Sequence, residues 1–172
     1  MLLKITGVTL LFISSSMFGY VLSSEFSKRI KVIEKFYKSL INLRGEINYN
    51  NSGIKEAIET ISSDKGAVES FYDAVLEIFE KKGISINDAW KLAIKQELET
   101  VNYIKKDELL IIKELGENIG ITDRKTQINN INYAMDKLSR LMQELRESKT
   151  SKCKIYRMMG IVTGMFVAII LI

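Results

Sequence analysis

The sequence predicts an all-α protein: a cytoplasmic helical bundle of about six helices, flanked by an N-terminal and a C-terminal transmembrane helix. Three observations lead to this fold class. Apolar residues in the middle of the chain recur at helical spacing, not in the alternation of a strand. The 172 residues include no proline, so nothing in the sequence interrupts long helices. Uncharged stretches rich in apolar residues occupy both ends of the chain.

Composition excludes most enzyme classes. Histidine is absent, which removes the commonest general base and the commonest metal ligand. Cys153 is the single cysteine, so the chain has no internal disulfide and no thiolate metal cluster. No phosphate-binding loop and no dinucleotide-binding glycine motif occurs in the sequence. We therefore predict no catalytic residues, no metal, no cofactor and no small-molecule substrate.

Residues 1–24 are predicted to form an N-terminal transmembrane anchor. The twenty residues 5–24 carry no charge, and a helix of that length matches a hydrocarbon core of about 30 Å. Serines dilute this stretch, and a cleaved signal peptide with Leu22 and Ser23 near its cleavage site is the alternative. The single Lys4 in front of the stretch and the basic residues directly after it favour an uncleaved anchor.

Residues 156–172 are predicted to form a C-terminal transmembrane anchor. The fifteen residues 158–172 are uncharged, but as a helix they extend only about 22 Å. A buried C-terminal core helix is therefore the alternative. Gly160 and Gly164 form a Gly-x-x-x-Gly pattern, which predicts close packing of this segment against another helix.

The net charge of +4 is distributed in a way that favours a membrane over nucleic acid. Residues 25–40 carry a net +3 and residues 146–157 a net +4, whereas residues 41–145 carry a net −4. Basic segments beside apolar ends suit anionic lipid headgroups. Because basic residues prefer the cytoplasmic side of a membrane, we expect the middle domain to be cytoplasmic and both termini to lie on the outer side.

The middle domain, residues 25–155, begins with two predicted helices. The first carries an apolar stripe and breaks in the polar and glycine-containing run 48–53. The stripe consists of Ile30, Ile33, Tyr37, Leu40 and Ile47. Ser52 is placed to cap a short second helix that bears Ile54, Ile58 and Ile61.

The next three predicted helices are delimited by glycines and caps. The third carries Val68, Phe71, Val75 and Ile78 and ends at Gly83. Ser85 and Asp88 predict a capping box that opens the fourth, which carries Trp90, Ile94 and Leu98. The fifth carries Leu109, Ile112, Leu115 and Ile119 and closes at Gly120. The aromatic residues Phe71, Tyr72, Phe79 and Trp90 are predicted to be core residues.

The sixth helix has the most regular pattern. Its apolar residues alternate steps of three and four, as in a coiled coil, and it is expected to start near Thr122 and to continue into the C-terminal anchor. These residues are Ile128, Ile131, Met135, Leu138, Met142 and Leu145. An intramolecular core is the favoured interpretation, and self-association into a homo-oligomer is the alternative.

One segment, residues 115–127 (LGENIGITDRKTQ), is unusual. Gly116 interrupts a helical pattern, which predicts close approach of another backbone. Gly120 fits the left-handed position that ends a helix, and Thr122 or Asp123 is suited to cap the next one. Arg124 and Gln127 extend the apolar seam of the sixth helix with polar groups. This corner is either a partner-binding surface or a purely structural turn.

The corner and the order of the segments resemble the stage III sporulation protein AB family of spore-forming Firmicutes. The residues that match the family pattern are Leu115, Gly116, Gly120, Asp123, Arg124 and Gln127. The resemblance implies a component of the mother-cell membrane around the forespore, within a channel between the two cells. The middle domain is similar to the cytoplasmic domains of the type II secretion platform protein F. By that analogy the partners are a sporulation ATPase, stage III sporulation protein AA, and other channel components.

The leading hypothesis is thus a non-enzymatic platform that couples a cytoplasmic ATPase to membrane partners. A two-anchor membrane sensor with a helical ligand-binding domain is the alternative. The positive segments place the middle domain inside the cell, which disfavours the sensor. A membrane-embedded enzyme ranks third, because the uncharged stretches of the two predicted anchors, residues 5–24 and 158–172, contain no charged residue.

Overall fold

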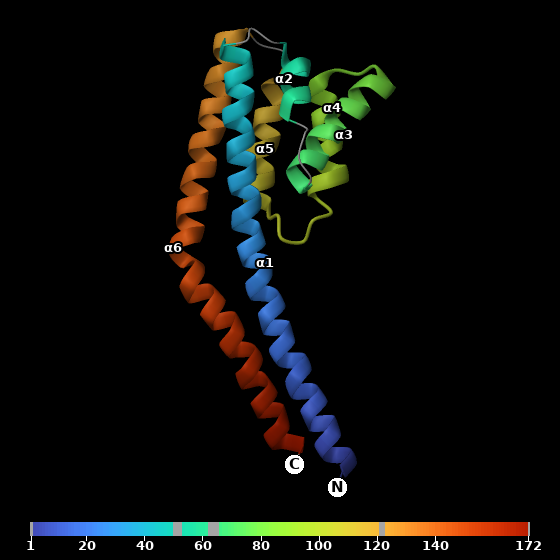
Figure 1. Cartoon of the computed structure of the whole chain (residues 1–172), viewed down its shortest axis with the longest axis vertical. Helices are drawn as coiled ribbons and strands as arrows, with labels where there is room; N and C mark the ends of the chain where they lie inside the picture. The colour runs from blue at the N-terminus through green and yellow to red at the C-terminus, as the bar shows by residue number, and fades with distance from the viewer. Residues whose placement is uncertain (1, 50–52, 62–65, 121–122, 172) are drawn as a thin grey trace. The chain divides into compact units, whose positions relative to one another are not determined.

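The computed structural model describes residues 2–49, 53–61, 66–120 and 123–171, without the side chains of residues 2–5, 8, 11, 12, 16, 167, 168, 170 and 171. All regular secondary structure in these ranges is helical (Figure 1), which confirms the predicted all-α class. The elements are α1 (Leu2–Tyr49), α2 (Ile54–Ile61), α3 (Ala67–Lys82), α4 (Ile86–Ala93), η1 (Ile94–Leu98), α5 (Lys106–Asn118) and α6 (Arg124–Leu171).

The chain divides into two compact units. The central unit comprises Lys31–Gln143, and the terminal unit combines Met1–Ile30 with Glu144–Ile172. The two 48-residue helices, α1 and α6, each contribute to both units. The predicted continuity of the sixth helix toward the C-terminus is confirmed, since α6 runs unbroken to Leu171.

The core of the central unit is built around four aromatic side chains. Phe36 of α1, Phe71 and Tyr72 of α3, and Trp90 of α4 are all buried. The ring centroids of Phe71 and Trp90 lie 4.8 Å apart in an edge-to-face arrangement, which aromatic quadrupoles favour. The Tyr72 hydroxyl is satisfied by the Ser39 hydroxyl at 2.9 Å, and burial raises the pKa of Tyr72 well above its ordinary value. Phe79, also predicted to be a core residue, is only half-buried.

The predicted helix ends of the central unit are largely confirmed. Gly83 ends α3 in the left-handed conformation with φ of 60°, where a side chain would be strained. Ser85 caps α4, because its hydroxyl accepts a hydrogen bond from the Asp88 amide at 3.1 Å. The π-helical turn η1 that follows α4 was not predicted. Ser52, the expected cap of α2, lies outside the described residues.

The buried faces of the two long helices differ in part from their predicted stripes. On α1, Phe36 and Leu43 are buried in addition to the predicted residues, whereas Tyr37 is only half-buried. On α6, Ile131, Met135, Leu138 and Leu145 are buried, and Ile128 and Met142 are half-buried. The seam of α6 is thus covered within one chain, as the intramolecular interpretation predicts. Self-association stays a prediction.

The expected transmembrane helices are not found in the structure. No helix among the described residues is long and apolar enough to cross a membrane. Serine and glycine interrupt the apolar residues of the first predicted anchor, residues 1–24. Parts of both predicted anchors, including residues 2–5 and 170–172, fall outside the described side chains. Whether 1–24, 25–155 and 156–172 act as separate domains stays a prediction.

Candidate partner-binding corner and paired ends

Gly120 follows the end of α5 in the corner that leads to α6. This glycine has a φ of 76°, in the left-handed region that non-glycine residues rarely adopt. A Cβ added there would lie 3.5 Å from Ile54 Cγ2 and 3.7 Å from Ile86 Cβ, which is ordinary contact. The backbone conformation, not lack of space, therefore accounts for the glycine.

Asp123 caps the N-terminus of α6. Its carboxylate accepts hydrogen bonds from the Thr126 amide at 3.1 Å and from the Thr126 hydroxyl at 2.7 Å. These bonds, the hydroxyl bond foremost, lower the pKa of Asp123. The negative charge also complements the positive end of the helix dipole. Asp123 was one of two predicted caps, and the other, Thr122, lies outside the described residues.

Arg124 connects the start of α6 to the end of α1. Its guanidinium donates a hydrogen bond to the backbone carbonyl of Asn48, one of the last residues of α1. Carbonyls in the last turn of a helix have no intrahelical donor, and a cation there also complements the helix dipole. One turn earlier on α1 and about two turns further along α6, the Arg44 guanidinium donates to Asn132 Oδ1 at 2.9 Å. Two arginines therefore hold the central parts of α1 and α6 side by side.

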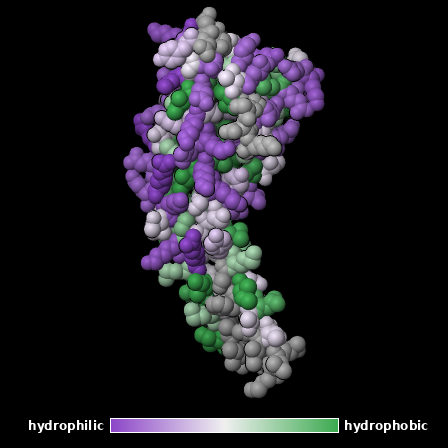
Figure 2. Space-filling view, viewed as in Figure 1, coloured by the Kyte–Doolittle hydropathy of each residue, from purple (hydrophilic) through white to green (hydrophobic). Residues whose placement is uncertain are grey.

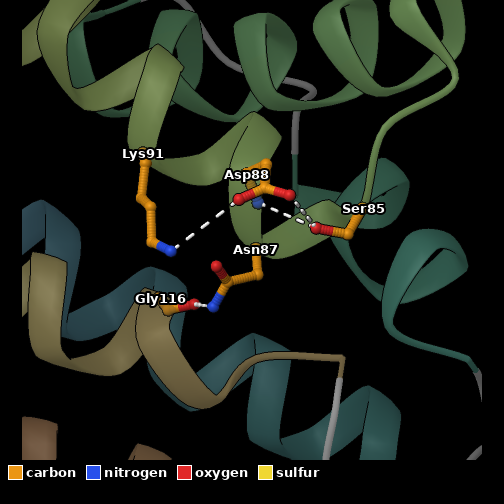
Figure 3. Close-up of polar contacts among 5 residues, drawn as sticks. All are labelled: Ser85, Asn87, Asp88, Lys91 and Gly116. Atoms are coloured by element: carbon orange, nitrogen blue, oxygen red, sulfur yellow. Dashed lines mark hydrogen bonds and ion pairs between the residues drawn. The ribbon is translucent and has the colours of Figure 1, made fainter.

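Gly116 lies against a side chain, so the prediction that another backbone approaches it was wrong. A Cβ at this position would overlap Cδ1 of Trp90 on α4. The amide of Asn87 donates to the Gly116 carbonyl at 2.5 Å (Figure 3). The indole Nε1 of Trp90 donates to the Ile112 carbonyl at 3.0 Å. The glycine thus lets the indole pack directly on the α5 backbone.

The remaining corner residues have different surroundings. Leu115 is buried in the core, and Gln127 is half-buried one turn into α6. Both line a small internal space of 10 Å³ between α5 and α6. The backbone N–H of Gln127 donates to the Asp123 carbonyl at 2.9 Å, in the first turn of the helix. Leu115 and Gly116 therefore belong to the packed interior, whereas Asp123 and Arg124 reach the surface.

A surface hollow lies beside the two exposed corner residues. It has a volume of 590 Å³. Its lining residues are Asn48, Asp123, Arg124, Lys125, Ile128 and Asn129. Lys125 and Asn129 are exposed, and neither side chain has a hydrogen bond or ion pair within the described structure. The corner thus combines internal hydrogen bonds with unused polar groups that face outward.

The predicted packing glycines lie in the terminal unit, where Gly160 packs against α1 of the same chain. A Cβ at Gly160 would lie 2.7 Å from the Ser15 carbonyl oxygen and 3.1 Å from Gly19 Cα. The Ser15 hydroxyl donates to the Gly160 carbonyl at 2.7 Å. Gly164, one turn further on, is buried as well.

The α1 side of this contact was not predicted, although the sequence contains its signal. Ser15, Gly19 and Ser23 are spaced four residues apart, so they lie on one face of α1 and allow close approach of a second helix. Ser23 is buried, and its carbonyl oxygen lies 3.6 Å from Cys153 Sγ. The small residues on the two helices therefore face one another.

The described residues contain no group of three or more histidine, cysteine or acidic side chains that could hold a metal ion. Their geometry defines an all-helical protein with a packed aromatic core in one unit and closely paired helix ends in the other.

Comparison with known proteins places this architecture in one family. The profile of the stage III sporulation protein AB family matches residues 4–172, and the chain belongs to that family. Stage III sporulation protein AB of Bacillus subtilis (strain 168) is 23% identical over 171 residues, which cover 99% of each chain. A solved structure of a stage III sporulation protein AB is similar with a TM-score of 0.64 and 25% identity, covering 72% of this chain and 97% of that one.

Proposed function

We propose that this chain is a non-enzymatic platform component of a sporulation channel between the mother cell and the forespore. In this role the central unit binds a cytoplasmic ATPase, the stage III sporulation protein AA. The terminal unit contacts the mother-cell membrane and other channel components. Membership of the stage III sporulation protein AB family, over residues 4–172, is the observation that carries the proposal.

Exposed apolar side chains of the terminal unit support the membrane contact. They gather on the surface of the two paired helices of the terminal unit (Figure 2). Those described are Leu10, Ile13, Met17, Phe18, Tyr20, Val21, Ile155, Met158, Met159, Ile161, Val162, Met165, Phe166 and Ile169. A large exposed apolar surface marks a site of contact with a membrane or with another protein.

The corner supports the ATPase contact through its outward-facing groups. Asp123 and Arg124 are engaged by the Thr126 cap and by the Asn48 carbonyl. The surface available to a partner is therefore the hollow beside them, with Lys125 and Asn129 at its rim. Charged groups at the rim of an interface steer association and set specificity. We expect the ATPase to present an acidic or amide-rich surface to Lys125.

The proposal is tested by isolating the tagged full-length chain from sporulating cells and quantifying the ATPase that copurifies. Lys125→Glu reverses the exposed charge at the corner and leaves the bonds of Asp123 and Arg124 intact, so the ATPase should be lost. Lys113→Glu makes the same charge change on α5, outside the hollow, and should retain it. Equal recovery of the ATPase with both variants would place its binding surface elsewhere. Failure of the wild-type chain to recover any ATPase would contradict the proposed partnership.

A further inference from the structure

We propose that a groove on the terminal unit binds the headgroup of an anionic phospholipid. The groove has a volume of 510 Å³ and follows one side of α6, with Ser27 of α1 contributing to its lining. This inference rests on the proposed contact between the terminal unit and a membrane. It adds a specific lipid class and a defined set of binding residues.

The polar end of the groove is uniformly cationic. Lys149, Lys154 and Arg157 line it together with the hydroxyls of Ser27 and Thr150, and no carboxylate does. All three basic side chains are exposed, and neither lysine side chain has a hydrogen bond or ion pair within the described structure. Lysine and arginine beside hydroxyl donors are the groups that bind phosphate oxygens.

The other end of the groove is apolar, and its position follows from helix spacing. Residues 149, 153 or 154, 157 and 161 are separated by about one turn each, so they share one face of α6. From Lys149 to Ile161 this face extends about 18 Å. The three cations occupy its first part, and Met158 and Ile161, both exposed, occupy its last. The order along the groove, cationic and then apolar, is that of a phospholipid headgroup followed by its acyl chains.

Arg157 lies where the two ends of the groove meet, and its guanidinium is held in place. The guanidinium carbon is 5.7 Å from the centroid of the Tyr20 ring on α1. A cation at this distance from an aromatic face is attracted to it, which restricts the arginine without using its hydrogen-bond donors. The N–H donors of the guanidinium therefore stay available to an acceptor such as a phosphodiester group.

The apolar end identifies the occupant as a lipid and not a free anion or a nucleic acid. Beyond Ile161, Met165, Phe166 and Ile169 of α6 are also exposed, so apolar surface continues from the groove along the helix. Inorganic phosphate would use only the cationic end, and so would an acidic peptide. A phospholipid is the ligand that would use both ends at once.

The test measures lipid retained by the purified full-length chain. The chain is equilibrated with mixed micelles of phosphatidylglycerol and phosphatidylcholine, and the bound lipids are counted by native mass spectrometry. The wild type should retain phosphatidylglycerol in preference to phosphatidylcholine. The triple variant Lys149→Gln, Lys154→Gln, Arg157→Gln should retain about tenfold less phosphatidylglycerol, since each basic residue beside an anionic lipid contributes to binding.

A matched variant separates a built site from general attraction between opposite charges. The triple variant Lys28→Gln, Arg29→Gln, Lys152→Gln also removes three positive charges from the terminal unit, but all three lie outside the groove. We expect it to retain phosphatidylglycerol to within about threefold of the wild type, because diffuse charge effects are screened by salt. Equal losses in the two triple variants would overturn the groove. Equal retention of the two lipids by the wild type would also overturn it.

Cys153 provides a second readout that leaves the charges unchanged. It is the single cysteine, it is half-buried, and it lines the groove. A bulky maleimide on Cys153 should displace the retained phosphatidylglycerol, whereas the small methylthio group should not. Retention after bulky labelling would contradict the site. Displacement of phosphatidylglycerol by a polyglutamate peptide that binds only when the three basic residues are present would reassign the groove to a protein partner.

Vesicle flotation distinguishes the failure of this inference from failure of the proposed membrane contact. If the wild-type chain floats with neither phosphatidylcholine nor phosphatidylglycerol vesicles, the membrane contact itself is wrong. If all variants float and retain the two lipids equally, only the groove is wrong.

Discussion

Arg124, the first residue of α6, donates a hydrogen bond to the backbone carbonyl of Asn48 at the end of α1. The two residues are 76 positions apart in the chain, yet their bond joins the two long helices at the corner. The bond gives Arg124 an acceptor inside the protein. From the sequence alone, the acceptor could equally have been on a partner. The structural role of this arginine is therefore testable separately from partner binding.

Arg124→Ala should lower the free energy of unfolding of the central unit by about 1 kcal/mol, because the Asn48 carbonyl loses its donor. Trp90 is the only tryptophan and is buried in the central unit, so its emission reports unfolding of the full-length chain in urea. Lys125→Ala is the matched control, since this exposed neighbour should change stability by less than about 0.5 kcal/mol. Identical urea midpoints for the two variants would show that the bond to Asn48 contributes nothing.

The helix caps were predictable because they depend on residues close together in the sequence. Ser85 with Asp88, Gly83 and Asp123 all occupy their predicted positions, since a cap is formed within three or four residues. The same reasoning gave the buried seam of α6. Local patterns of this kind fix where a helix ends and which face it buries.

Contacts between distant segments could not be predicted in the same way. The sequence marks Gly116 as unusual, but Trp90 lies 26 positions earlier, and nothing local shows that its indole fills the space. The contact between Gly19 and Gly160 had a signal in the sequence, the four-residue spacing of small residues on α1. The serines of this segment were interpreted only as polar interruptions of an anchor, so their spacing was not used. The expected transmembrane helices depended on uncharged length alone, and none is found among the described residues.

Gly116→Ala should destabilise the protein by about 2 kcal/mol or more, because the added methyl group overlaps the Trp90 indole in a packed core. Unfolding is followed here by circular dichroism at a helical wavelength, since the substitution perturbs Trp90 itself. Trp90→Phe combined with Gly116→Ala should cost less than the sum of the two single changes, because the smaller ring makes room.

Gly45→Ala is the control for that substitution. Gly45 also lies inside a helix, but a Cβ there meets nothing within 4 Å. Alanine should therefore stabilise α1 by about 0.5–1 kcal/mol through its better helix propensity. If both glycine variants changed stability in the same direction, packing against Trp90 would not explain Gly116.

Asp123 should make stability depend on pH in the acidic range. Hydrogen bonds from Thr126 lower the pKa of its carboxyl in the folded protein, so the folded state favours the charged form. The contribution is therefore present above the pKa of an unfolded aspartate, about 3.9, and is lost as the pH falls through the lower folded value. Asp123→Asn should be less stable than the wild type at neutral pH, and the difference should shrink toward pH of about 3. A constant difference across that range would rule out the carboxylate cap as its source.

Cys153 should lie on the cytoplasmic side of the mother-cell membrane, because basic residues surround it on α6. A membrane-impermeant maleimide should leave this thiol unlabelled in intact protoplasts and label it after permeabilisation. The thiol is half-buried, so labelling of the permeabilised sample serves as the control for access. Efficient labelling of intact protoplasts would place this segment of α6 outside the cell.

Gly160→Leu should separate the paired ends of a single chain. The Cβ at this position would lie 2.7 Å from the Ser15 carbonyl oxygen and 3.1 Å from Gly19 Cα, which are backbone atoms that cannot move aside alone. Proximity is measured in the full-length chain by joining Cys153 to a cysteine introduced as Ser23→Cys, with a short bifunctional maleimide. The intrachain product should form readily with Gly160 present and drop markedly with Gly160→Leu.

Gly7→Leu is the matched control, because a Cβ at Gly7 meets nothing within 4 Å. It adds the same side chain to the terminal unit and should leave the intrachain product unchanged. Close packing in lipid depends on small residues that let two backbones approach, so only the position in the contact should matter. If Gly160→Leu reduced crosslinks between chains but preserved those within a chain, the glycine would serve assembly of several copies and not the pairing of α1 with α6.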